Sequence, residues 1–214
     1  MTIARHTGAA AVLAVAALFL TGCGGSPMPT STSDDELFTR ARAVNAAFKS
    51  SVAEVQRELW VDEWRVGAYG DMPAACGSDE FRFEMSRDLP VADGWRFPSE
   101  PGAMRDDLAG WMESNGYTDI TGLSYTDDVD TLTLTARNVD AGIDEITVQF
   151  HPGEVQDGIS LSASSVCEAG DVDELAEAIY PGLYEDSSRE WPLPETERPD
   201  ATPIFGFTED GQPR

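Results

Sequence analysis

The chain is poor in basic side chains and in nitrogen and sulfur ligands. It has one lysine, Lys49, two histidines and three cysteines. Its 39 acidic residues outnumber its 14 basic ones, giving a net charge of −25. Such an acidic chain repels phosphate backbones and anionic lipid headgroups. Nucleic acid is therefore not expected as a partner, and nonspecific adhesion to a membrane surface is disfavoured.

The scarcity of histidine limits the chemistry available. Too few imidazole and thiolate ligands are present for a zinc or copper site. His151 stands in FHPGE after an expected strand and is interpreted as a turn residue, since no Gly-x-Ser-x-Gly or Ser-x-x-Lys pattern accompanies it. Asp127, Asp128 and Asp130 cluster, but the sequence from Asp128 lacks the Gly and the Glu of an EF-hand loop. We therefore predict no catalytic, cofactor-binding or metal-binding residue.

No apolar run reaches the ~20 residues that cross a bilayer as a helix. The uncharged run from Ala9 to Leu20 follows Arg5 and His6, which is typical of a signal peptide. Residues 23–33 are mostly small and polar with two prolines, which is typical of a flexible tether.

Leu20-Thr21-Gly22-Cys23 resembles the lipobox of bacterial lipoproteins. The resemblance implies that residues 1–22 are removed and that the thiol of Cys23 carries a diacylglycerol. Two acyl chains hold a soluble domain to a membrane durably, so we expect a lipid-anchored protein on the outer face of the cytoplasmic membrane. An ordinary secretory signal followed by an incidental cysteine is the alternative.

Once Cys23 is committed to lipid, Cys76 and Cys167 remain as a pair in an oxidising compartment. We predict that they form a disulfide. Closing a loop of this length stabilises the fold by about 4–5 kcal/mol in the chain-entropy model. Two buried thiols or a metal-binding pair are the alternatives.

Hydrophobic periodicity predicts alternating groups of helices and strands. Leu37, Ala41 and Phe48 belong to an apolar stripe of a long helix that begins near Asp34. Two further helices are expected at 105–115 and from 171 to about 180, where Pro181-Gly182 ends the pattern. Strands are expected at 64–69, 81–85, 119–125, 131–137, 145–150 and 158–167, and 71–80 is expected to be a turn region.

This order predicts an α+β fold, a two-layer sandwich in which an antiparallel sheet carries helices mainly on one face. The domain is expected to span residues 34–182. Residues 183–214 form an acidic, proline-rich tail that is expected to be irregular. The residues that we expect to hold the tail against the domain are Trp191, Ile204, Phe205 and Phe207.

Residues 60–120 resemble small secreted lipoproteins of actinobacteria in three features. The features are a YGD-x-P-x-x-C segment that ends at Cys76, a W-x-x-P step from Trp95 to Pro98, and an L-x-x-W helix that contains Trp111. The resemblance implies no particular activity and transfers no functional residue.

We therefore expect a non-enzymatic binding or accessory protein of the cell envelope, whose partner is an envelope protein, a glycan or a peptide. A carboxylate-dependent cell-wall hydrolase is the alternative, because two facing acids suffice for glycoside hydrolysis. A spacer module is a third possibility.

Overall fold

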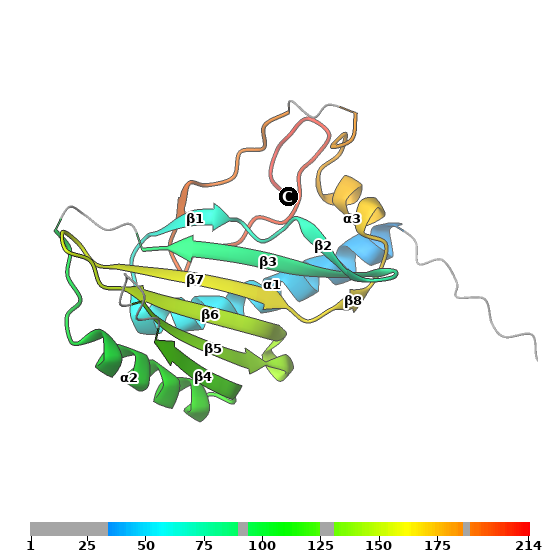
Figure 1. Ribbon diagram of the computed structural model, residues 1–214. Coiled ribbons are helices and arrows are strands. Elements are labelled where there is room, and N and C mark those ends of the chain that lie inside the picture. The colour runs from blue at the N-terminus through cyan, green and yellow to red at the C-terminus, as the bar shows by residue number, and fades with distance from the viewer. Residues whose placement is uncertain (1–33, 90–93, 125–130, 186–188) are drawn as a thin grey trace, which may run out of the picture. The chain divides into compact units, whose positions relative to one another are not determined.

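The computed structural model describes residues 34–89, 94–124, 131–185 and 189–214. The predicted signal peptide (1–22), the tether 23–33 with Cys23, and the acidic cluster Asp127, Asp128 and Asp130 lie outside the described residues. The ribbon in Figure 1 shows the arrangement of the described elements.

A single antiparallel sheet forms the centre of the fold, in the order β4-β5-β6-β7-β3-β1-β9, with β2 and β8 pairing to β3 off this path. This confirms the predicted antiparallel sheet. The strands are β1 (Trp64–Ala68), β2 (Pro73–Gly77), β3 (Glu80–Asp88), β4 (Thr118–Ser124), β5 (Leu132–Asn138), β6 (Ile143–His151), β7 (Gly158–Ser165), β8 (Glu168–Ala169) and β9 (Thr196–Glu197).

The prediction of a turn region at 71–80 is wrong for residues 73–77, because they form β2, which makes a hairpin with β3. The turn between them includes Asp79, whose φ of 59° is one that Asp tolerates better than most residues. Pro73 begins β2, a position where its missing N–H removes no ladder bond. The alanines of β2 give no hydrophobic alternation, so the sequence pattern did not reveal the strand.

Three α-helices and one 3-10 turn accompany the sheet. They are α1 (Asp34–Leu59), α2 (Pro101–Ser114), η1 (Val139–Ala141) and α3 (Val172–Ile179). α1 runs behind β6 and β7 and contacts α3, whereas α2 packs against β4 and β5 (Figure 1). Asp171 caps α3 by accepting a hydrogen bond from the backbone N–H of Glu174. The predicted α+β architecture is therefore confirmed.

The core lies between α1 and one face of the sheet. Phe48 and Val52 of α1 are fully buried, and along β7 the buried residues Ile159 and Leu161 alternate with serines. Phe205 and Phe207 of the C-terminal segment (189–214) belong to the same hydrophobic core. The segment is largely irregular, as predicted, but aromatic packing attaches it to the domain.

Candidate functional site

Small hydroxyl side chains cover the face of the sheet opposite the helices. Ser162 on β7 lies in register with Ser86 on β3 and with Thr147 on β6. A surface hollow of ≈ 410 Å³ opens over these strands, and its lining includes Arg82, Glu84, Ser86, Glu145, Ser162 and Ser164. We call it the open-face hollow. It forms because serines leave room where larger side chains would fill the sheet surface.

The charges around the open-face hollow are partly paired. Arg82 donates to Glu84 from Nε at 2.8 Å, and Arg137 forms an ion pair with Asp144 at the rim. Glu145 is exposed and forms no ion pair within the described part of the chain. The hollow therefore presents an uncompensated carboxylate beside several hydroxyls.

His151 lies on the same face of the sheet as the serines, at the end of β6. The turn predicted for this residue is wrong, because it still pairs with Gly158 of β7. Its Nε2 lies 2.9 Å from Oγ of Ser160, and its Nδ1 lies 3.4 Å from the hydroxyl of Thr131. Burial lowers the pKa of His151, and Asp88 opposes this change.

A histidine beside a serine hydroxyl is the geometry of a base and a nucleophile. Here the other ring nitrogen faces the hydroxyl of Thr131. Within the described residues His151 has no hydrogen bond to a carboxylate of the kind that stabilises an imidazolium in a catalytic triad. Ser160 also donates to Gln149 at 3.3 Å. The group serves as a hydrogen-bond ladder across β6 and β7.

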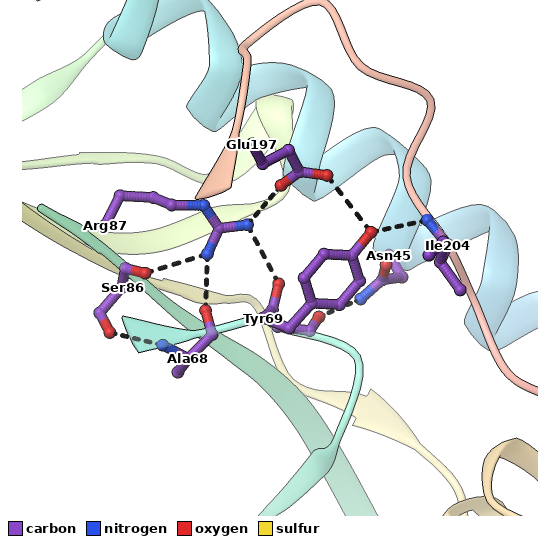
Figure 2. Close-up of polar contacts among 8 residues, drawn as sticks. Asn45, Ala68, Tyr69, Ser86, Arg87, Glu197 and Ile204 are labelled. Atoms are coloured by element: carbon purple, nitrogen blue, oxygen red, sulfur yellow. Dashed lines mark hydrogen bonds and ion pairs between the residues drawn. The ribbon is translucent and has the colours of Figure 1, made fainter. Parts of the chain in front are cut away.

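A second group of polar side chains lies beneath the C-terminal segment. We call Lys49, Tyr69, Asp71, Arg87 and Glu197 the buried polar cluster, and Figure 2 shows the part around Arg87. The residues come from α1, from the loop after β1, from β3 and from β9. The sheet, the long helix and the C-terminal segment therefore meet at this point.

Arg87 holds the cluster together. Its side chain is 1% exposed and forms an ion pair with Glu197 at 2.7 Å. Its two terminal nitrogens also donate to the carbonyl oxygens of Ala68, at 2.6 Å, and of Tyr69, at 3.3 Å. A buried guanidinium needs such acceptors, because an unpaired buried charge is costly.

The hydroxyl of Tyr69 connects two parts of the C-terminal segment (Figure 2). It accepts a hydrogen bond from the backbone N–H of Ile204 at 2.7 Å and donates to Glu197 at 3.3 Å. Burial and the neighbouring carboxylate of Glu197 raise the pKa of Tyr69, although the bond from Ile204 opposes them. The neutral phenol is therefore the form that holds the segment in place.

The only lysine of the chain is buried in this cluster. Lys49 is 4% exposed, and its Nζ lies 3.4 Å from the centroid of the Tyr69 ring, within the range of a cation–π contact. Burial lowers the pKa of Lys49 to about 8, against the opposing effects of Asp71 and Glu197. In the described part of the chain, Nζ has no hydrogen-bond partner.

Asp71 is the most deeply buried acid of the cluster, with 1% exposure. Burial raises its pKa, although a hydrogen bond from the hydroxyl of Tyr180 and the charge of Lys49 oppose this change. Its Oδ2 accepts no hydrogen bond within the described residues. Asp71 is therefore a shielded acid and not one that faces a substrate cleft.

The sequence contains weak signs of this cluster. Tyr69 and Asp71 belong to the YGD segment of the actinobacterial resemblance, and Arg87 continues the inward positions of Phe83 and Met85 along β3. A lone lysine inside an apolar helical stripe was a further sign. No pattern indicated Glu197, which lies 110 residues from Arg87 in an irregular segment.

Cys76 and Cys167 form the predicted disulfide, with their Cα atoms 6.2 Å apart. Glu80 lies beside the two sulfur atoms, and the three residues have the spacing of a metal-binding group. Sulfur atoms that are bonded to each other are not thiolates, so the disulfide removes the ligands such a site needs. The disulfide links β2 to the connection between β7 and β8.

Every helix in the described ranges is too short or too polar to span a membrane. Comparison of the chain with protein-family models, with curated protein sequences and with solved structures yields no significant match.

Proposed function

We propose that this chain is an extracytoplasmic lipoprotein, anchored through Cys23, that binds a basic peptide segment of another envelope component in the open-face hollow. The observation that carries the proposal is the hollow itself, which opens on the sheet face left uncovered by the helices. The ligand would therefore meet a rigid surface built on three central strands.

The chemistry of the lining favours a cationic peptide. Glu145 has no ion pair there, and the whole chain carries a net charge of −25, which attracts basic partners. Ser86, Ser162 and Ser164 offer hydroxyls that both donate and accept, as backbone amides require. Among the described residues that line the hollow there is no aromatic ring for a sugar to stack on.

A carboxylate-dependent hydrolase has less support. Such an enzyme needs an acid with a raised pKa that faces its substrate. Among the described residues, the acid with a raised pKa is Asp71, which is 1% exposed and hydrogen-bonded to Tyr180. Its neighbours include the charge of Lys49, and its burial leaves no surface for a polysaccharide to contact.

The anchor is tested by replacing Cys23 with Ala in the producing cells. We expect the variant to leave the membrane fraction and appear in the medium, because the acyl chains supply the membrane affinity. Labelling with an alkyne analogue of palmitate should mark the unaltered protein and not the variant. Equal labelling of both, or unchanged partitioning into detergent, would contradict the anchor.

The binding site is tested with two variants of equal charge. Ser162→Arg places a cation in the open-face hollow, whereas Ser50→Arg places one on the exposed side of α1. With a fluorescent hexalysine peptide as the probe, we expect Ser162→Arg to weaken binding about tenfold and Ser50→Arg less than about twofold. Equal weakening by both variants would mean only long-range attraction and would refute the site.

A further inference from the structure

The buried polar cluster borders a small cavity that the proposed function does not use. It has a volume of ≈ 20 Å³, and its lining includes Lys49, Gln56, Arg87, Glu197 and Arg198. A void needs ~10–15 Å³ to hold one water molecule. The cavity is therefore large enough for one water or one monatomic ion and too small for sulfate or a carboxylate group.

Two cationic side chains that line the cavity have N–H groups without a hydrogen-bond acceptor among the described residues. The Nζ of Lys49 and the Nε of Arg87 are buried and have no hydrogen-bond acceptor within the described residues. The two residues are 4% and 1% exposed, so bulk water does not supply acceptors freely. Unmet donors on buried charged groups are costly, which indicates that something in the cavity accepts from them.

The charges around the cavity favour an anion as this acceptor. Three of the lining residues, Lys49, Arg87 and Arg198, are basic, and one, Glu197, is acidic. Glu197 is already engaged by Arg87 at 2.7 Å. Arg198 is paired with exposed acids outside the cluster. Of the three basic residues in the lining, Lys49 is therefore the one that forms no ion pair with the described residues. The lining of the cavity is therefore net positive, although the protein as a whole is strongly acidic.

The acids near Lys49 do not accept hydrogen bonds from its ammonium group within the described residues. Asp71 acts on Lys49 through space, but the described contacts include no ion pair between the two groups. Tyr69 presents its ring to the ammonium and directs its hydroxyl to Glu197 and Ile204. One side of the ammonium thus meets a π face, and its N–H groups remain available to a ligand in the cavity.

We propose that this cavity is a binding site for a single chloride-sized anion, held by Lys49 and Arg87 and closed by the C-terminal segment. Pro199, Ala201 and Pro203 of that segment form part of the wall. The anion would therefore bind the folded chain with the segment in place and not the unfolded chain. Binding of this kind stabilises the folded state by mass action.

The test is urea unfolding of the purified, disulfide-intact protein at constant ionic strength, with sodium gluconate replaced stepwise by sodium chloride. We expect chloride to stabilise the folded state in a saturable and specific way. When the chloride concentration exceeds its dissociation constant 100-fold, the unfolding equilibrium constant should fall about 100-fold. Bromide should act like chloride, and sulfate at equal ionic strength should not.

Lys49→Met should abolish the chloride effect, and Arg65→Met, which removes an exposed arginine paired with Asp88 on the open face, should keep it. Chloride-35 NMR gives a readout on the unaltered protein, in case the Lys49 variant does not fold. The native protein should broaden the chloride line, and bromide should reverse the broadening. Equal stability in chloride and gluconate, without broadening, would mean that the cavity holds water only and would refute the proposal.

Discussion

The open-face hollow and the buried polar cluster lie on opposite faces of β3, as three consecutive residues of this strand show. Ser86 and Asp88 lie on the open face, whereas Arg87 between them is 1% exposed on the packed face. Polar groups on the open face exchange hydrogen bonds with water at little cost, whereas those on the packed face must be paired within the fold. The open face is thus suited to binding, and the packed face fixes the position of the C-terminal segment.

The largest difference in stability between the two regions is expected when an arginine is replaced. Arg87→Met removes the ion-pair partner of Glu197 and the donor to three backbone carbonyls, and removing one partner of a buried ion pair costs about 3–5 kcal/mol. Arg65→Met breaks an exposed pair with Asp88, which is worth about 0–1 kcal/mol. Urea unfolding of both variants measures the comparison. Similar losses for the two would show that the cluster is not buried as described.

Lys49 should make stability depend on pH in the alkaline range. Its folded pKa of about 8 lies below the ~10.4 of an unfolded chain, so the unfolded state binds more protons between these values. The cost of burying the charge, about 3 kcal/mol, is fully present below pH 8 and disappears as the pH rises to about 10.4. The free energy of unfolding should therefore increase over this window.

Lys49→Met is the control for this pH dependence, because it removes the titrating group. The free energy of unfolding of the variant should lack the increase between pH 8 and 10, measured by urea titration in gluconate buffers. Tyr69 and Tyr180, which is hydrogen-bonded to Asp71, act in the opposite sense, since their raised pKa values favour unfolding as the pH rises through about 10. A parallel pH profile for both proteins would rule out Lys49 as the source.

The smallest difference in stability is expected between substitutions of two serines of β7. Ser165 is fully buried, accepts from the backbone N–H of Phe83 at 2.9 Å and donates to the carbonyl of Val166 at 3.0 Å. Ser165→Ala should cost about 1–3 kcal/mol, because it leaves that N–H unpaired. Ser162→Ala on the open face should change stability by less than about 0.5 kcal/mol. Thermal unfolding of both variants distinguishes the two faces.

Much of the fold was predictable because its elements carry local periodicity. The stripe of α1 and the alternation along β3 and β7 each place a hydrophobic face without reference to the rest of the chain. β2, β8 and β9 were missed because they are short and lack this alternation, so their pairing depends on neighbours that are distant in the sequence. The disulfide was predictable from the number of cysteines and the expected compartment.

The candidate sites were less predictable. Serines on an exposed strand face are ordinary in sequence, and they become a hollow only when three strands bring Ser86, Ser162 and Glu145 together. His151 was expected in a turn, but pairing with β7 keeps it on the sheet, where Ser160 meets its ring. The hollow also needs β3 to pair with β7, which lies about 75 residues further along the chain, and the local alternation of either strand does not specify its partner.

The sequence by itself determined the acidic charge, the helix and strand periods, the pairing of Cys76 with Cys167 and the expectation of a lipid on Cys23, because each depends on composition or on short-range order. Only the tertiary structure decided that the lone lysine is buried beside Arg87 and that Glu197 reaches both from the C-terminal segment. The physical reason is that burial and charge pairing are properties of the assembled chain, and the residues concerned come from three separate elements.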